Sequence, residues 1–363
     1  MKKTIKVFGF PSHQTVERTS GVDYARIIQP LKYLHGYQDD EVKIKVEMFD
    51  IREIKPKSWK KIAKEFDIVY LNYTVLDWNY AAMGCFVHGE GKKIIYDIDD
   101  AIWYIRPDNV THDKMKEING AEIVTCMLND VDYVTTTNRY LRNVIINQTN
   151  KHNDKIKVFP NMVDLTMYNK TFPAKDSNDI TLLHYGSNSH FQDLLDKDFV
   201  SGIDRIFARY PNVKIKFVGA FVQELKYKWG ARCETAFGDT DILKWISGRF
   251  QECMEEADII VAPLEDDKYN RSKSSIKFVE TASAMKPGVF SNVRPYTDDV
   301  QDGVTGYIAK NSDDWFNALS KLIESKEERQ RVGENAYNYI RDNFQIQNNL
   351  APYVSLFKEA VGS

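Results

Sequence analysis

One stretch in the second half of the chain, residues 262–288, constrains the fold and the chemistry more than any other. The apolar residues 258–264 predict a buried strand, and a polar loop follows them. A helix is predicted over Asn270–Met285 because Pro287 and Gly288 end it. A strand that leads through a loop into a helix is a building unit of parallel α/β sheets, so this fold class is favoured from the start.

The polar residues of this predicted helix fall on one side of it. On a helical wheel, an arc of about 120° holds five of them: Asn270, Lys273, Ser274, Lys277 and Glu280. Two ammonium groups near a helix N-terminus, just past the carboxyl end of a strand, suit an anion such as a diphosphate. Glu280 lies a turn further on, where a carboxylate can accept hydrogen bonds from sugar hydroxyls. The alternative interpretation is a solvated helix face whose charges bind nothing.

The spacing Asn-x-x-Lys-Ser-x-x-Lys-x-x-Glu, followed by a small residue, glycine and a new strand, resembles the donor site of retaining GT-B glycosyltransferases. It is most similar to one branch of glycosyltransferase family 4. The resemblance implies that Lys273 and Lys277 act in catalysis on the diphosphate. It also implies that the nucleotide is bound by polar side chains of this segment: Glu280, Ser274 and Asn270. The family usually carries an earlier glutamate, whose position is taken here by Ser272, a weaker candidate donor contact.

Size and composition narrow the class of protein. A chain of 363 residues is longer than one core usually supports, so two domains are expected. A net charge of −3 argues against a uniformly basic surface that wraps nucleic acid. Four scattered cysteines without metal-ligand spacing predict reduced, mostly buried thiols. No apolar run approaches the roughly 20 residues that span a bilayer, and the N-terminal one is too short for a signal peptide, so we expect a cytoplasmic protein.

Predicted strands and helices alternate along the whole chain. Strands of the first half are predicted at 5–10, 42–50, 67–73, 93–98, 133–137 and 156–160. After the polar residues 171–179, strands are predicted at 180–185, 213–219, 242–245, 258–264, 289–292 and 306–309. This alternation predicts mainly parallel sheets with helices on both faces. We therefore predict an α/β protein with two tandem Rossmann-like domains and a cleft between them.

The predicted domains are residues 1–170 on the acceptor side and residues 179–343 on the donor side. Amphipathic helices are predicted near the end of the chain at 315–324, 327–343 and 345–360. The resemblance to GT-B enzymes implies that the last segment, residues 344–363, packs back on the N-terminal domain as a helix.

A small-residue loop follows the first strand of each predicted domain. Gly21 lies in the fragment Ser-Gly-x-x-Tyr-x-Arg-Ile-x-x-Pro, which is similar to the same glycosyltransferase branch and lets backbone approach a phosphate or sugar. In the second half, Gly186 and Ser187 are expected to contact the donor. Many relatives carry an arginine and a lysine here, so the resemblance shifts charge neutralisation onto the two lysines described above. His190 is expected to be structural.

The segment Tyr-Asp-Ile-Asp-Asp, residues 96–100, ends a predicted strand. An Asp-x-Asp motif there can hold a divalent cation on a diphosphate, but the lysines already neutralise that charge, so neither a metal nor another cofactor is expected. The resemblance instead puts Asp97 and Asp100 on the acceptor-side wall and lets Asp99 polarise the reacting hydroxyl. Alternation along the strand puts the first and third residue of the motif on one face, and capping of the next segment is the alternative role. Trp103 is expected to line an acceptor pocket, with buried packing equally compatible.

These observations predict a retaining, metal-independent glycosyltransferase that moves a sugar from a nucleotide-diphosphate sugar to a hydroxyl acceptor of a glycan or glycolipid. One alternative is the same chemistry on a nucleic-acid base, as in phage enzymes of this architecture, and another is a non-catalytic nucleotide-binding module. The basic residues 55–64 predict a solvated helix and at most a peripheral membrane contact. The acceptor and the oligomeric state are left open by the sequence.

Overall fold

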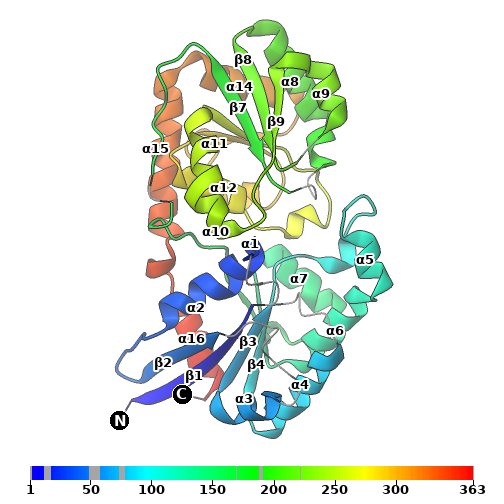
Figure 1. The fold of residues 1–363 in the computed structure, drawn as a ribbon, viewed down its shortest axis with the longest axis vertical. Coiled ribbons are helices and arrows are strands. Elements are labelled where there is room, and N and C mark those ends of the chain that lie inside the picture. Colours follow the sequence, from blue (N-terminus) through cyan, green and yellow to red (C-terminus); the bar gives the residue numbers. More distant parts are fainter. Residues whose placement is uncertain are drawn as a thin grey trace.

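The computed structural model describes residues 2–11, 18–48, 58–72, 78–168, 170–187, 191–220 and 222–362, without the side chains of 78–82. The chain forms two α/β domains, stacked along the long axis of the molecule (Figure 1). Within the described ranges, no helix has the length and apolar character that a membrane crossing needs.

The N-terminal domain is built on a six-stranded sheet with the order β2-β1-β3-β4-β5-β6, in which all paired neighbours are parallel. Its strands are β1 Lys3–Phe10, β2 Val42–Met48, β3 Ile68–Asn72, β4 Lys93–Ile98, β5 Tyr133–Thr136 and β6 Ile156–Val158. The central strands β3, β4 and β5 are rich in buried Ile, Val and Tyr because helices cover both faces of such a sheet.

Helices of the N-terminal domain form two layers. They are α1 Gly21–Asp23, α2 Gln29–Leu34, α3 Trp59–Glu65, α4 Trp78–Gly89, α5 His112–Glu117, α6 Gly120–Asp130 and α7 Arg139–Gln148, with a π-helical turn at Tyr24–Ile28 between α1 and α2. Helices α3, α4, α6 and α7 pack into one hydrophobic core on one face of the sheet. On the opposite face, α2 packs into a second core that it shares with the C-terminal helix of the chain.

The C-terminal domain repeats this plan with the strand order β12-β11-β10-β7-β8-β9, again with parallel pairings. Its strands are β7 Ile180–Tyr185, β8 Val213–Val218, β9 Cys233–Ala236, β10 Ile259–Ala262, β11 Gly288–Ser291 and β12 Tyr307–Ala309. Its helices are α8 Lys197–Arg209, α9 Gln223–Trp229, α10 Ile242–Lys244, α11 Phe250–Glu256, α12 Ile276–Ser283, α13 Tyr296–Asp299, α14 Ser312–Glu324 and α15 Lys326–Asn343. The strand order reverses between β7 and β10, which is where ligands bind in doubly wound sheets.

The chain ends by returning to the N-terminal domain. Helix α16, Ala351–Ala360, lies against the first sheet (Figure 1) and buries Tyr353 and Phe357 there. The ring of Tyr353 lies 4.3 Å from that of Phe159, measured between centroids, and the ring of Phe357 lies 6.2 Å from that of Tyr70. The predicted fold class, two Rossmann-like domains with a C-terminal helix that crosses back, is therefore confirmed.

Two predicted elements are wrong. Residues 242–245, predicted as a strand, are helical in α10 and in the π-helical turn Trp245–Arg249, and the strand of this region is β9, which the sequence pattern did not predict. The predicted helix Asn270–Met285 begins only at Ile276. Asn270–Ser272 form a separate 3-10 turn: Asp267 accepts a hydrogen bond from the backbone N–H of Asn270 at its start, and the extended backbone of Lys273 ends it before α12.

Other predictions need smaller corrections. Only Cys233 and Cys253 are buried, whereas Cys85 and Cys126 are exposed, so the thiols are not mostly buried. Some predicted positions lie outside the described residues: 49–50 and 73 of two predicted strands, 55–57 of the predicted basic helix, and His190. The described part of that basic segment does form α3, with its lysines exposed.

Candidate active site

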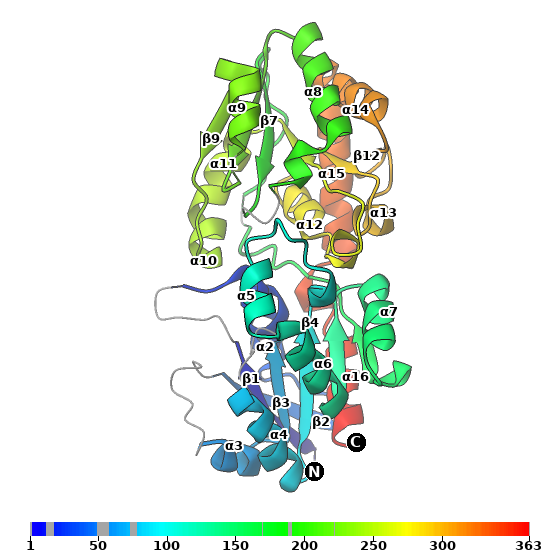
Figure 2. The same ribbon diagram turned by 90° about the vertical axis from the view of Figure 1, so that its right-hand side faces the viewer.

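A cleft of about 750 Å³ lies between the two domains. Helices α10 and α12 lie at the edge of the C-terminal domain that faces the N-terminal domain (Figure 1 and Figure 2). From the N-terminal domain the lining includes Arg18, Gly21, Tyr24, Asp99, Asp100 and Asn161. From the C-terminal domain it includes Tyr185, Gly186, Ser187, Gly219, Asp239, Trp245, Lys273, Ser274, Lys277, Glu280 and Tyr296. Since parallel strands present ligand sites at their carboxyl ends, the cleft is where the fold predicts a binding site.

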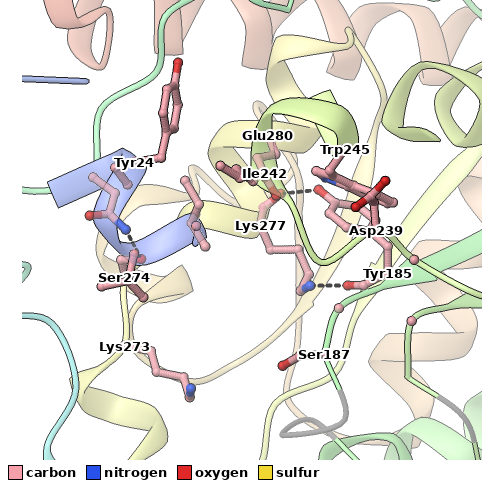
Figure 3. Close-up of a pocket in the computed structure, with 18 of the residues that line it drawn as sticks. Tyr24, Tyr185, Ser187, Asp239, Ile242, Trp245, Lys273, Ser274, Lys277 and Glu280 are labelled. Atoms are coloured by element: carbon pink, nitrogen blue, oxygen red, sulfur yellow. Dashed lines mark hydrogen bonds between the residues drawn. The ribbon is translucent and has the colours of Figure 1, made fainter. Parts of the chain in front are cut away.

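Lys277 lies in the first turn of α12 and points its ammonium group into the cleft (Figure 3). Its Nζ donates a hydrogen bond to the carbonyl oxygen of Tyr185 and lies 4.5 Å from the centroid of that ring. Burial lowers the pKa of Lys277 to about 8, although the nearby carboxylate of Glu280 opposes this shift. A second negative charge beside the ammonium group would stabilise its protonated form, and a phosphate group can provide that charge.

Glu280 lies one turn after Lys277 on the same face of α12 and is buried. The hydroxyl of Tyr168 donates a hydrogen bond to its Oε1 over 3.3 Å. Burial raises the pKa of Glu280, while Lys277 and the hydroxyls of Tyr168 and Tyr185 lower it. A buried carboxylate at the wall of a cleft is suited to accept hydrogen bonds from ligand hydroxyls.

Lys273 stands in extended backbone before α12, and its ammonium faces the opposite domain. Its Nζ lies 3.8 Å from Oδ1 of Asp100 and 4.5 Å from the ring centroid of Tyr269, whose hydroxyl donates to Oδ2 of Asp100. Burial alone would lower the pKa of Lys273, but Asp100 and Tyr269 outweigh it, so the pKa is raised. Lys273 is thus a permanent cation, in contrast to Lys277.

Asp99 is a carboxyl group of the cleft wall with an unfilled hydrogen-bonding position. It follows β4, lines the cleft, and has a buried Oδ1 without a hydrogen-bond partner among the described residues. Burial raises the pKa of Asp99 well above its usual value, and the neighbouring Asp100 and Asp97 raise it further. An unsatisfied carboxyl oxygen at the wall of a cleft is a ready acceptor for a hydroxyl hydrogen.

Asp97 does not lie in the cleft, contrary to the prediction. Its carboxylate is fully buried inside the first domain and pairs with Arg26, whose Nε lies 3.0 Å from Oδ1 and whose Nη2 lies 2.7 Å from Oδ2. The hydroxyl of Thr135 also donates to Oδ2. Strand β4 ends at Ile98, so the alternation that would bring Asp97 and Asp99 onto one face no longer holds.

Three more predicted contacts lie outside the cleft lining. Trp103 packs against the core of the N-terminal domain and donates its Nε1–H to Oγ1 of Thr125. Asn270 is buried and donates to Oδ1 of Asp193 over 2.8 Å. Ser272 is buried too, and its hydroxyl donates to the carbonyl oxygen of Lys268. These three side chains form their hydrogen bonds with other groups of the protein. Ser272 therefore does not take the place of a sugar-binding glutamate.

Four of the predicted donor contacts do line the cleft, namely Gly21, Gly186, Ser187 and Ser274. Gly186 and Ser187 follow β7, and Ser274 accepts a hydrogen bond from Nδ2 of Asn161 across the domains, over 2.8 Å. Gly21 opens α1 at the opposite wall. Close packing beside Gly186 requires another glycine, Gly219, which has a φ of +84° and whose Cβ would lie 2.3 Å from the carbonyl oxygen of Gly186.

Aromatic residues and one carboxylate of the lining were not predicted. They are Tyr24, Tyr168, Tyr185, Phe237, Trp245, Tyr296 and Asp239. Tyr24 lies within the fragment that resembles the glycosyltransferase branch, so a signal for it was present. The other positions become neighbours only through the fold, because they come from five separate segments: the end of β7, the π-helical turn at Trp245, the start of α13 and two loops.

Comparisons with known proteins agree with this geometry. Residues 197–339, which lie in the C-terminal domain, match the model of the family Glycosyl transferases group 1. A search of curated protein sequences gave no match.

Solved structures resemble the whole chain. Anabaena HepE in complex with UDP-glucose is 13% identical, has a TM-score of 0.64, and is matched over 97% of this chain and 100% of that one. A glycosyltransferase from Rickettsia africae ESF-5 is 14% identical, with a TM-score of 0.64 and 99% of both chains covered. Sucrose-phosphate synthase from Thermosynechococcus elongatus is 12% identical, with a TM-score of 0.63 and 99% of both chains covered. At these identities the likeness shows the fold, and with the matched domain it supports a glycosyltransferase of GT-B architecture.

Proposed function

We propose that the protein is a retaining glycosyltransferase, similar to family 4, that moves a sugar from a nucleotide-diphosphate sugar to a hydroxyl acceptor. One observation carries the proposal: Lys273, Lys277 and Glu280 converge on the cleft between the domains, inside the matched glycosyltransferase domain. The cleft of about 750 Å³ is large enough for a nucleotide sugar, since ligand pockets commonly measure about 300–1,000 Å³. We keep the cytoplasm as the proposed compartment because all four cysteines are free.

In this proposal the donor lies along α12. Glu280 accepts hydrogen bonds from the ribose hydroxyls, and Lys277 and Lys273 bind the diphosphate. The loop of Gly186 and Ser187 adds backbone and hydroxyl contacts to the phosphates. The complex of Anabaena HepE with UDP-glucose supports a nucleotide sugar as the donor class.

Transfer develops negative charge on the departing phosphate and positive charge on the sugar ring. Groups that stabilise this growing charge accelerate the reaction. Lys273 and Lys277 provide the positive charge at the phosphate end. Retention is proposed to follow from attack on the face that the leaving group vacates, with the leaving phosphate taking the proton of the acceptor hydroxyl. Asp99 holds that hydroxyl by accepting a hydrogen bond from it.

We propose that the reaction needs no metal because the lysines neutralise the diphosphate. The Asp-x-Asp alternative meets an obstacle here, since Asp97 is committed to Arg26 and Asp100 to Lys273 and Tyr269. Among the described residues, no group of three or more His, Cys, Asp or Glu side chains is arranged to hold a metal ion.

A binding screen followed by product analysis tests the proposal. Nucleoside diphosphates and their sugars are screened by thermal shift, and the binders are incubated with candidate acceptors before mass analysis. We expect one nucleoside diphosphate to stabilise the protein and its sugar to be transferred or hydrolysed. Glu280→Gln is expected to weaken nucleotide binding about tenfold or more, since a charged hydrogen-bond partner is lost. Lys273→Ala is expected to lower turnover. Binding without hydrolysis or transfer would favour a nucleotide-binding module instead.

A further inference from the structure

A side chain of the N-terminal domain holds the backbone of the lysine-bearing loop in the C-terminal domain. Asn138 follows β5, and its Nδ2, which carries two hydrogens, lies within hydrogen-bond distance of three consecutive carbonyl oxygens. The donor–acceptor distances are 2.7 Å to Lys273, 2.9 Å to Ser272 and 3.5 Å to Arg271. The hydroxyl of Thr137 adds a contact of 3.4 Å to the same carbonyl of Ser272. One side-chain amide group thus contacts the backbone of the whole segment that leads into α12.

These carbonyl groups need a donor from outside their own segment. The 3-10 turn ends at Ser272, Lys273 is extended, and α12 begins at Ile276, so the carbonyls of the last two residues of the turn and of Lys273 have no following helical turn to bond with. Among the described residues, no backbone N–H donates to any of them. Buried or half-buried carbonyl groups without a partner are costly, so this segment depends on a donor from the other domain.

We propose that Asn138 is a positioning residue for the donor: it fixes the backbone of Lys273 so that the ammonium group stays in the cleft. The inference rests on the proposed function and assigns a donor-site role to the acceptor-side domain. Asn138 itself does not line the cleft, so it acts through Lys273 and not by touching the donor.

Asn138 also caps a helix, and this second role allows a substitution that removes only the contacts to the loop. Its Oδ1 accepts the backbone N–H of Leu141 over 2.7 Å and so caps α7. Serine caps helices about as well as asparagine, but it has no amide that reaches the loop. Asn138→Ser therefore removes the cross-domain contacts and keeps the cap. Asn311 is a matched control, because it caps α14 in the same way, through the backbone N–H of Asp314, far from the cleft lining.

The experiment compares nucleotide affinities by calorimetry. It uses full-length protein, the nucleoside diphosphate that stabilises it most, and the corresponding nucleoside without phosphates. For Asn138→Ser we expect the Kd of the diphosphate to rise about tenfold, because one or two hydrogen bonds that hold the Lys273 segment are lost. The Kd of the nucleoside is expected to stay constant. Asn311→Ser is expected to change neither. In a Lys273→Ala background, Asn138→Ser is expected to have no further effect, since the group that it positions is gone.

The outcomes separate this inference from the proposal on which it rests. Wild-type affinity in Asn138→Ser would overturn the positioning role and leave the glycosyltransferase proposal intact. Equal losses for nucleoside and diphosphate would also overturn it, because they indicate a general structural change. Failure of the wild-type protein to bind any nucleoside diphosphate would instead refute the proposed function. Thermal unfolding of each variant, with a Tm within a few degrees of wild type, verifies that the folded protein is measured.

Discussion

Binding of a nucleoside diphosphate is expected to weaken as the pH rises through about 8, because Lys277 must be protonated to hold the diphosphate. Burial lowers the pKa of this side chain to about 8, so in the free protein it loses its proton near that pH. A bound diphosphate raises the pKa again, since its negative charge favours the ammonium form. Binding above pH 8 must therefore take up a proton, and the cost of this uptake grows with pH.

The magnitude follows from the fraction of protonated Lys277. With a pKa of about 8, roughly nine-tenths of the side chains are charged at pH 7 and roughly one-tenth at pH 9. The affinity is thus expected to fall about tenfold between these values, which corresponds to about 1.4 kcal/mol. Lys273 does not contribute to this change, because its raised pKa keeps it charged throughout. The phosphate groups are mostly ionised from pH 7 upward, since their second pKa lies near 6.

Isothermal titration calorimetry in buffers of different ionisation enthalpy measures both the affinity and the proton uptake. In Lys277→Met the affinity is expected to be lower at pH 7 and independent of pH between 7 and 9. Asp99→Asn is the control, because the pKa of Asp99 is also raised and its deprotonation would repel a diphosphate in the same direction. A pH dependence that survives in Lys277→Met and disappears in Asp99→Asn would refute the assignment to Lys277.

Further predictions concern two buried charged groups outside the cleft and the acceptor-side carboxylate. Asp97→Ala is expected to destabilise the protein by about 3–5 kcal/mol in urea unfolding, because it leaves Arg26 buried without its partner; a loss below 1 kcal/mol would contradict the structural role of the pair. Lys286→Met is expected to stabilise the protein by about 2 kcal/mol at pH 7. Burial lowers the pKa of Lys286 to about 8, which costs about 3 kcal/mol, whereas the carbonyl of Ala257 that loses its donor costs about 1. Since the unfolded lysine titrates near 10.5, the wild-type penalty fades between pH 8 and 10.5, and the difference in unfolding free energy should shrink with it. Asp99→Asn is expected to lower turnover more than it changes donor affinity, and equal wild-type turnover would exclude a role in holding the acceptor.

The fold was predictable because its signals are long and repeated. Eleven of the twelve strands in the described part of the chain were predicted close to their observed positions, since buried parallel strands have apolar runs between helical patterns. The strand that was missed, β9, and the segment wrongly predicted as a strand, 242–245, show the limit of this signal. The segment 242–245 is apolar and short, so its periodicity does not separate a strand from a helix, and its helical form depends on the cap that Asp241 provides. Strand β9, with Glu234 and Thr235 in its four residues, has too few apolar side chains to stand out.

The candidate site was predictable where chemistry follows spacing within one helix. Lys277 and Glu280 lie on α12 as predicted and reach the cleft together. Asn270 and Ser272 fail because the helix starts later, so the helical wheel no longer describes their directions. The prediction that Asp97 lines the cleft is wrong for a different reason. Its partner Arg26 lies 71 positions away in the sequence, and no local sequence pattern predicts such a pair.

The matched family domain covers the C-terminal half, yet the site is completed from the other half. Lys273 owes its permanent charge largely to Asp100, Ser274 receives its hydrogen bond from Asn161, and the loop between them is held by Asn138. All three partners belong to the N-terminal domain and stand after the carboxyl ends of its strands β4, β5 and β6. Because both sheets direct these ends toward the same cleft, each domain supplies polar groups that the other leaves unsatisfied. If the protein is the proposed glycosyltransferase, we therefore expect the N-terminal domain to be part of the donor site, and substitutions there to change donor affinity as well as acceptor choice.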